Sequence, residues 1–414
     1  MTLQRQRLLR RVTIASDDTG ANFHTGLGIR LEFGRECDII VPMRRHLRVF
    51  GPLLLVGCRP AGPVDPLANE LASCAPCHQS IVGRYRQTAH YATSAPATAA
   101  TIKGTFAAGH DVLKTRDTAV FFRMEQRGSQ FFQTGVDSRA RRSETQSIDL
   151  DIGSGRRGQT YGYWRDGILV ELPVSYLTAP NEWINSPGYP DGQIDFTHVV
   201  VPRCLECHST RFTVEQQGGR ARYASQYQLG IGCAKCHGDA TAHVAAPTAQ
   251  NVRNPARFER DRKLDTCGLC HSGPRRLLRP PFSFVAGEPL DQYLVPQADS
   301  STARPDVHGD QIGLLARSRC FKQSPQMSCA TCHDVHQPER DLTQMSGKCL
   351  QCHQADRHPA IRAGGDLTAG CVGCHMPTEE SRGLQLNGAT GQSALSFRSH
   401  RIAVYPPRAP VTAR

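Results

Sequence analysis

The clearest pattern of apolar and polar positions lies in the segment 101–197, where short alternating runs predict β-strands. Two pairs of runs are separated by short turn sequences, Gly128-Ser129 in the first pair and Asp166-Gly167 in the second. A two-residue turn with glycine between alternating runs is a strong signal for a β-hairpin. The runs of the first pair span 119–124 and 130–133, and those of the second span 160–164 and 168–172. We therefore predict a β-rich module over these residues.

Within this segment, residues 153–158 match the glycine pattern of dinucleotide-binding proteins. That pattern binds pyrophosphate where it leads into a helix whose N-terminus faces the ligand. Here a strand-like run follows at 160–164, so we interpret the glycines as a hairpin connection. Pro173 closes the next strand, and the stretch 181–195, rich in turn residues, predicts a boundary after the module.

The N-terminal part of the chain contains a short apolar run after a basic start. Residues 43–48 include three arginines and residues 49–57 are mainly apolar, which resembles the first two regions of an export signal. The run ends in a lipobox-like sequence at Cys58, which makes this cysteine a candidate for lipidation. We predict a non-native extension at 1–42, a lipoprotein signal peptide at 43–57 and a flexible tether at 58–70. The alternative is a buried apolar strand with an incidental cysteine.

Seven copies of one motif, Cys-x-x-Cys-His, carry the recognisable chemistry of the chain. This motif attaches c-type haem: two thiols bond to the macrocycle edge, and the histidine coordinates the iron from one face. Numbered as motifs 1 to 7 in chain order, the cysteines are Cys74 and Cys77, Cys204 and Cys207, Cys233 and Cys236, Cys267 and Cys270, Cys329 and Cys332, Cys349 and Cys352, and Cys371 and Cys374. The proximal histidines are His78, His208, His237, His271, His333, His353 and His375. Zinc half-sites need no such histidine, so zinc binding is the weaker interpretation.

The motifs divide the chain unevenly. Motif 1 defines a first haem segment at 71–100, with a short helix expected at 73–87, and motifs 2 to 7 crowd into a six-haem module at 198–378. At roughly 30 residues per haem, separate protein cores are too small, so the macrocycles themselves are expected to supply much of the apolar interior. We predict a multihaem cytochrome c of α+β type with low regular content. Short α-helices and irregular loops would surround stacked haems, the β-rich module would be a haem-free insert, and 379–414 would form a C-terminal tail.

Histidines outside the motifs can supply the second, distal ligand of each iron. Eight follow the predicted signal peptide: His90, His110, His198, His243, His308, His336, His358 and His400. His400 requires that the tail folds back. His243 follows His237 by six residues and His336 follows His333 by three, too close to reach the opposite face of the same haem, so each is expected to serve a neighbouring haem. Four methionines are weaker candidates, because core packing is their more common role: Met124, Met327, Met345 and Met376.

The formal net charge of +12 does not indicate a nucleic-acid partner. Each haem adds two propionates, and a basic leader would be removed, so the loaded mature protein is expected to be negatively charged. Three cysteines fall outside the motifs, Cys37, Cys58 and Cys320, and we expect Cys320 to be a reduced, buried thiol. No stretch approaches the roughly 20 apolar residues of a membrane span.

The motifs and their flanks resemble those of bacterial multihaem c-type cytochromes of the cytochrome c-552/4 type. The shared features are a glycine after motif 3 followed by His243, the sequence 328–336 around motif 5, Met376-Pro377 after motif 7, and residues 399–401. The resemblance covers roughly residues 71–405 and implies covalently bound haem c. Relatives of this type include electron carriers, nitrite reductases and hydroxylamine-oxidising enzymes. The Cys-x-x-Cys-Lys site of pentahaem nitrite reductases does not occur in this sequence.

We therefore expect an exported cytochrome with seven covalent haems c that carries electrons in the cell envelope through closely packed bis-histidine haems. Its expected partners are redox proteins or quinol-linked donors, together with other cytochromes. It would lie in the periplasm or at the outer membrane, held by a lipid anchor alone. Two alternatives remain open: a multihaem oxidoreductase acting on a small nitrogen or sulfur compound, and a haem-rich subunit of an extracellular complex or filament. An enzyme needs one iron with an open face, which the number of histidines permits but does not require.

Overall fold

The structure is a computed structural model, and it describes the chain in twelve stretches. These are residues 27–32, 36–41, 56–58, 66–296, 309–339, 341–354, 356, 358, 370–381, 386–388, 391–393 and 395–406. The chain divides into two compact units, residues 1–65 and residues 66–414. In the first unit, an antiparallel sheet has the order β1 (Leu27–Glu32), β2 (Glu36–Val41) and β3 (Val56–Cys58). Most of the predicted signal peptide lies outside the described residues.

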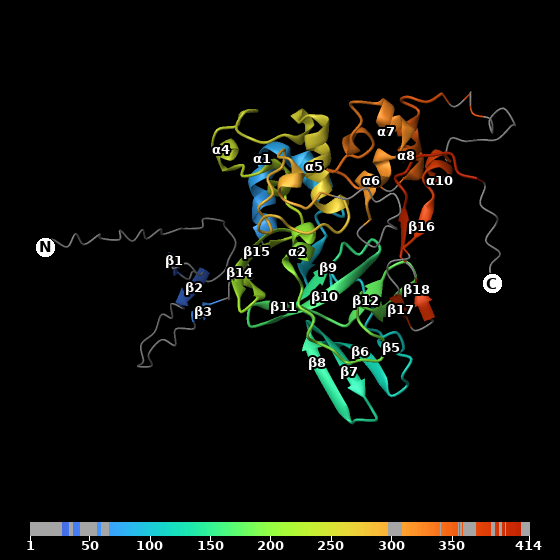
Figure 1. Ribbon diagram of the computed structural model, residues 1–414. Coiled ribbons are helices and arrows are strands. Elements are labelled where there is room, and N and C mark those ends of the chain that lie inside the picture. The colour runs from blue at the N-terminus through green and yellow to red at the C-terminus, as the bar shows by residue number, and fades with distance from the viewer. Residues whose placement is uncertain are drawn as a thin grey trace, which may run out of the picture. The chain divides into compact units, whose positions relative to one another are not determined.

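The second unit is an α+β mixture in which helices and strands occupy different regions (Figure 1). Its α-helices are α1 (Pro66–Tyr85), α2 (Pro202–His208), α3 (Ala234–His237), α4 (Thr241–Ala245), α5 (Arg260–His271), α6 (Gln311–Ala316), α7 (Arg319–Gln323), α8 (Leu342–Cys349) and α10 (Cys371–His375). Short 3-10 turns are η1 (Pro255–Arg257), η2 (Leu290–Gln292) and η3 (Cys329–Thr331). No helix among the residues described is both long and apolar enough to cross a membrane.

The strands form two larger sheets and two separate pairs. A four-stranded meander runs in the order β5 (Val112–Lys114), β6 (Val120–Arg127), β7 (Gln130–Asp137) and β8 (Arg142–Ser147). The eight-stranded sheet contains β4 (Ser94–Pro96), β9 (Leu150–Ile152), β10 (Gly158–Arg165), β11 (Ile168–Glu171), β12 (Val174–Leu177), β13 (Glu182–Asn185), β17 (Leu386–Gly388) and β18 (Gly391–Ser393). The two antiparallel pairs are β14 (Ser209–Gln217) with β15 (Arg220–Leu229), and β16 (Thr378–Glu380) with β19 (Ser396–Arg398).

Both predicted hairpins are confirmed. Gly128-Ser129 joins β6 to β7, and Asp166-Gly167 joins β10 to β11. Asp166 and Gly167 have φ values of 50° and 76°, the positive pair that a tight hairpin turn of the I′ kind requires. The glycine-rich residues 153–158 connect antiparallel strands β9 and β10, as the hairpin interpretation predicted.

The main apolar core lies in the β-rich region. Its largest side chains include Phe122, Phe131, Tyr161 and Trp183, which come from both sheets. Gln133 of β7 is fully buried and bonds both backbone groups of Val174, donating to its carbonyl at 2.7 Å and accepting from its N–H at 3.1 Å. A buried amide satisfied on both sides fixes how the meander lies on the larger sheet.

Four features differ from the sequence-based expectation. Helix α1 begins at Pro66, so the end of the predicted tether is helical, because Leu67 and Leu71 bury one face of it. Residues 182–185, expected in a turn-rich boundary, form strand β13, because Trp183 and Ile184 are buried in the sheet. The hairpin β14–β15 lies within the predicted six-haem module. The tail contributes β17, which pairs with β13 and covers its open edge.

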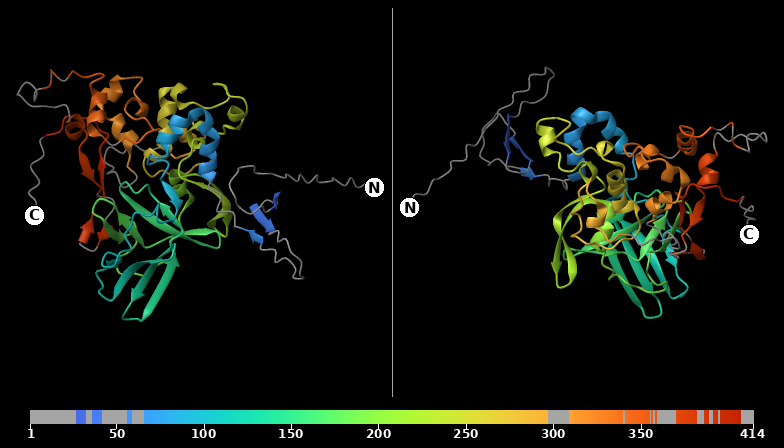
Figure 2. Two further views of the ribbon diagram at one scale, coloured as in Figure 1. Left: turned by 180° about the vertical axis from the view of Figure 1, so that it is seen from behind. Right: turned by 45° about the horizontal axis from the view of Figure 1, so that its top comes forward.

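The helical region brings together segments that lie far apart in the sequence. The views in Figures 1 and 2 agree that α1 lies beside α4 and α5, and that α8 lies beside α10. A second apolar cluster, with Leu150, Leu205, Phe212 and Tyr223, connects α2 to the eight-stranded sheet and to the β14–β15 hairpin. The β-rich part thus forms a base that holds motif 2 on α2.

Candidate haem-binding sites

Each of the seven motifs lies on or directly beside a helical turn. Motif 1 falls inside α1, where the backbone kinks at His78 (φ −117°, ψ 35°), and motif 4 ends α5. In motifs 3, 5 and 6 the histidine N–H donates to the carbonyl of the first cysteine, at 2.8–2.9 Å. A helical turn puts residues three and four apart on one face. Both thiols and the imidazole of a motif can therefore meet one macrocycle.

The structure brings five motif histidines close to five histidines from other parts of the chain. The ring centroids of these pairs lie 6.0–6.4 Å apart. The pairs are His78 with His243, His271 with His90, His237 with His336, His333 with His400, and His375 with His358. Each joins one motif histidine to one of the predicted distal histidines. His243 and His336 lie beside rings of motifs other than those they follow.

The separation of these rings fits an iron atom between them. With metal–nitrogen bonds of about 2 Å and ring nitrogens roughly 1 Å from each centroid, two imidazoles on opposite sides of a metal have centroids about 6 Å apart. Rings packed directly against each other can lie closer, as His198 and Tyr189 do at 4.1 Å. The residues present therefore fit a haem held by two axial histidines.

Hydrogen bonds orient the rings at Nδ1 and so keep Nε2 for the metal. The Nδ1–H of His237 donates to the carbonyl of Arg253 at 2.8 Å, and that of His375 donates to Ala403 at 2.9 Å. His243 has the same arrangement with the Thr248 carbonyl at 3.0 Å. A carbonyl oxygen only accepts, so each of these rings carries a proton on Nδ1, and Nε2 is the nitrogen that can face a metal. Such bonds to the far nitrogen typically accompany metal-binding histidines.

In motif 5, the partner of the histidine Nδ1 is a carboxylate and not a backbone carbonyl. Glu339 Oε2 lies 2.8 Å from Nδ1 of His333, and Glu339 Oε1 accepts the Asp334 N–H at 2.7 Å. A carboxylate at Nδ1 makes an imidazole a more electron-donating ligand. Sequence reasoning missed Glu339 and the carbonyl acceptors, because backbone acceptors carry no residue signature and Glu339 has no motif spacing.

Burial keeps several of these histidines neutral. Desolvation lowers the pKa of His271 to about 4, with smaller effects from His90 and His333 nearby. Desolvation likewise lowers the pKa of His400 to about 4 and lowers those of His90 and His237. A neutral imidazole is the form that binds a metal.

Cysteines of different motifs also lie side by side. Cys74 of motif 1 and Cys233 of motif 3 pack against one apolar cluster with Leu67 and Leu71. The thiols of Cys207 and Cys270 form a hydrogen bond with each other. The sulfur of Cys207 also lies 3.8 Å from the carbonyl oxygen of Leu269. The thiols of Cys267 and Cys329 form a third contact, between motifs 4 and 5. These contacts bring together the haem-attaching cysteines of three pairs of motifs: 1 with 3, 2 with 4, and 4 with 5.

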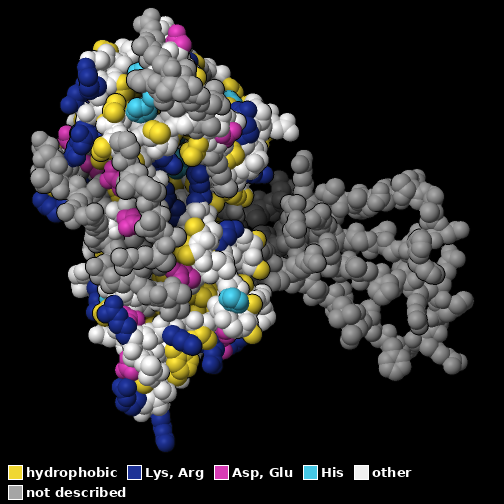
Figure 3. Space-filling model, turned by 90° about the vertical axis from the view of Figure 1, so that its right-hand side faces the viewer, with side chains coloured by type: hydrophobic (Ala, Val, Ile, Leu, Met, Phe, Trp, Pro, Cys, Tyr) yellow, Lys and Arg dark blue, Asp and Glu magenta, His cyan; other side chains and the backbone are white. Residues whose placement is uncertain are grey.

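Apolar side chains are exposed next to the candidate ligands. Ile81, Val244, Val335 and Leu350 are 36–49% exposed and lie within three residues of a motif or of a paired histidine. Figure 3 shows histidine and hydrophobic side chains together at the surface of the helical end. Haem macrocycles are flat apolar groups that would cover such side chains.

The remaining predicted site residues do not join a histidine pair in the part of the chain that the structure describes. His198 packs on Tyr189 and lies 3.5 Å from Asp195, and His110 is exposed beside the β-rich region. His308 lies outside the described residues. Cys58 ends strand β3, and its lipidation stays a prediction. Cys320 is half-buried on α7.

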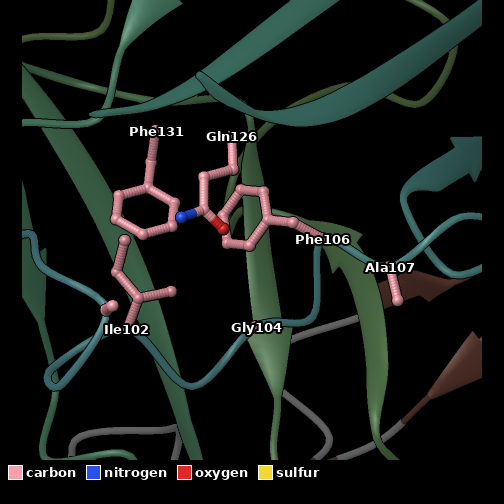
Figure 4. A pocket seen from close by; sticks show the side chains of 7 residues that line it. Ile102, Gly104, Phe106, Ala107, Gln126 and Phe131 are labelled. Atoms are coloured by element: carbon pink, nitrogen blue, oxygen red, sulfur yellow. The ribbon is translucent and has the colours of Figure 1, made fainter. Parts of the chain in front are cut away.

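A pocket of about 350 Å³ lies away from the motifs, in the β-rich region (Figure 4). Ile102, Phe106, Gln126 and Phe131 point into it, and Gly104 leaves room for the neighbouring Trp183 ring. None of its lining residues is a cysteine or histidine.

Comparison with known proteins supports the haem chemistry of this site. The family model described as cytochrome c554 and c-prime matches residues 190–238, which include motifs 2 and 3. Among solved structures, the outer cell wall cytochrome OcwA has a TM-score of 0.50 at 14% sequence identity, covering 80% of this chain and 78% of that one. The chain shares the fold of that cytochrome. These findings support the identification made from the sequence, namely a multihaem c-type cytochrome with covalently bound haem.

A second solved structure is an undecahaem cytochrome from the S-layer of Carboxydothermus ferrireducens. Its TM-score is 0.37 at 16% identity, and the alignment covers 77% of this chain and 53% of that one. No curated protein matches the chain.

Proposed function

We propose that the protein is an exported c-type cytochrome with seven haems that carries electrons in the cell envelope, with bis-histidine ligation of its irons. One observation carries the proposal: five pairs of histidine rings at 6.0–6.4 Å, each combining a motif histidine with a histidine outside the motifs. Random packing would not select one member from each class five times. For motifs 2 and 6 the proposal names no distal ligand, and His110, His198 and His308 remain the candidates.

The ligand arrangement favours electron transfer over catalysis. A bound haem supplies an iron that gains and loses one electron. Two neutral imidazoles held at Nδ1 would occupy both axial positions and leave no open position for a substrate. Bis-histidine ligation also favours low potentials, since a methionine ligand is what raises them. The protein's own part is to hold the rings rigidly, through contacts such as His237 to Arg253 and His375 to Ala403.

The contacts between motifs support close packing of the haems. The thioether bonds form at the macrocycle edge, so cysteines in contact imply neighbouring edges. The three contacts connect motif 1 to 3, 2 to 4, and 4 to 5. Helices α8 and α10 also touch, where the Val372 N–H lies 3.4 Å from Ser346 Oγ, which brings motif 7 to motif 6. We infer closely packed haems, an arrangement suited to passing electrons between partners.

The envelope location rests on the motif chemistry, the lipobox-like sequence at Cys58, and the fold shared with a protein named as an outer cell wall cytochrome. We propose redox proteins, quinol-linked donors or other cytochromes as partners, and attachment by a lipid anchor.

Haem content and ligation test this function directly. Intact mass under denaturing conditions should exceed the polypeptide mass by seven haems, and electron paramagnetic resonance of the oxidised protein should show low-spin iron. The reduced protein should bind little carbon monoxide, because six-coordinate iron has no free position. A high-spin haem in the wild type, with steady turnover of nitrite, hydroxylamine or a sulfur compound, would instead establish the oxidoreductase alternative.

A further inference from the structure

Three haem motifs converge on one lysine side chain. Lys235 occupies a variable position of motif 3, between Cys233 and Cys236. Its ammonium group interacts electrostatically with Cys270 of motif 4, with Glu206 and Cys207 of motif 2 and with Cys236 of its own motif, and these interactions oppose burial, which lowers the pKa of Lys235 from its ordinary value of 10.5. The contact between motifs 2 and 4 is tight here, because Arg203 on α2 also donates to the Leu269 carbonyl on α5 at 2.5 Å.

The surroundings of Lys235 hold its ammonium in place. Nζ lies 3.4 Å from the Thr210 carbonyl oxygen and 4.9 Å from the centre of the Phe282 ring. A cation over an aromatic face and beside a carbonyl is attracted by both. The carbon stem of the lysine therefore spans from motif 3 to the place where motifs 2 and 4 meet.

The nearest carboxylate is already matched by another cation. Glu206 on α2 is 1% exposed and lies near Lys235. One of its oxygens accepts from Arg203 at 2.8 Å and the other accepts the Phe282 N–H at 2.7 Å. Arg203 is always protonated, so Arg203 and Glu206 together carry no net charge. A protonated Lys235 then sets the net charge of this cluster.

We propose that Lys235 raises the reduction potentials of the haems held by motifs 2, 3 and 4, by placing a positive charge among their cysteines. This inference rests on the proposed function. Reduction of a haem iron adds one electron to the site, so a nearby positive charge stabilises the reduced state. The effect is large only where little water screens the charge, which holds between packed motifs. Lys235 is thus a positioning residue for the redox chemistry, not a ligand.

The test is a spectroscopic redox titration of the haem-loaded protein with Lys235→Met. Methionine keeps the length of the side chain and removes the charge. For the haems beside it, the ratio of reduced to oxidised iron at a given potential should fall about threefold to tenfold, equivalent to midpoints lower by ~30–60 mV. The rest of the titration curve should stay in place, and Lys235→Arg should restore the wild-type midpoints.

Lys348→Met is the matched control. Lys348 also precedes a motif cysteine, Cys349, but its side chain is exposed to water, so its removal should shift midpoints much less. Haem content and spin state are measured on each sample, so that the two proposals can be judged separately. A high-spin haem in the wild type would count against the proposed function and not against the role of Lys235. If Lys235→Met does not acquire its haems, Lys235→Gln is titrated instead. Unchanged midpoints in a haem-loaded neutral variant, or equal shifts for Lys348→Met, overturn the proposal.

Discussion

The rings of His78 and His243 face each other almost in parallel, with centroids 6.4 Å apart and planes inclined by 15°. His78 belongs to motif 1 on α1, whereas His243 lies on α4, just after motif 3. The turn that carries His243 is held by Asn251, whose amide donates to the carbonyls of Ala242 and Ala246. One iron site would therefore be built from two segments that are distant in the sequence.

Replacing His243 by alanine should open one iron site while leaving the others unchanged. Its imidazole is the proposed distal ligand of motif 1, so His243→Ala should convert about one haem per chain to a high-spin form that binds carbon monoxide when reduced. Glu215→Ala, at an exposed position of β14, is the control and should leave every haem as in the wild type. A fully low-spin His243→Ala protein would show that the ring pair does not hold an iron.

Replacing Glu339 by glutamine should raise the potential of the haem on motif 5. The carboxylate accepts from Nδ1 of His333 at 2.8 Å, which strengthens the ligand and favours oxidised iron. A neutral amide should increase the ratio of reduced to oxidised iron at that site about threefold to tenfold, or ~30–60 mV. Redox titration measures the shift, and Glu379→Gln, on the separate strand β16, should leave all midpoints in place.

Asp151 should make the protein less stable as the pH rises through the mildly acidic range. Burial raises the pKa of this carboxyl to about 7 from an ordinary value of 3.8. The folded protein then holds a proton that the unfolded chain has lost, so the free energy of unfolding should fall between about pH 4 and pH 7, by on the order of 2–4 kcal/mol. Denaturant unfolding followed by circular dichroism at pH 5 and pH 8 measures the loss.

The variant Asp151→Asn cannot ionise at this position, so its stability should change less between these two pH values. The change that remains is expected from Glu171, because burial also raises the pKa of that carboxyl to about 7. Glu215→Gln, exposed on β14, should keep the pH dependence of the wild type. An equal loss of stability in Asp151→Asn and the wild type would assign the effect to other groups.

For the N-terminal region, we predict that the mature protein begins at Cys58. If the lipobox-like sequence is used, the native protein should begin at a lipidated Cys58, and Cys58→Ala should remain unprocessed and unlipidated. Mass spectrometry of the purified protein reads out both the lipid and the first residue. Cys320→Ala is the matched control and should be processed normally, while peptides from residues 1–42 in native protein would contradict the prediction.

Local chemistry made the attachment sites readable from the sequence alone. A haem motif is a contiguous run in which two thiols and one imidazole must meet one rigid group, so the whole signal lies within five residues. The same holds for the hairpins. The turn at Asp166-Gly167 needs two positive φ values, and the residue types that adopt such values are visible in the sequence. Such features depend only on residues that are adjacent in the chain, so they can be predicted from the sequence.

The distal partners could not be assigned in this way, because a ligand needs only one histidine and any segment that folds to within reach can supply it. His90, His243, His336, His358 and His400 carry no local mark that says which motif they face. The sequence by itself determined that the chain attaches several haems and has enough histidines to ligate them. Only the tertiary structure decided that β13 joins the sheet, that the tail returns to His333 and that α4 meets α1, because these contacts depend on burial between distant segments.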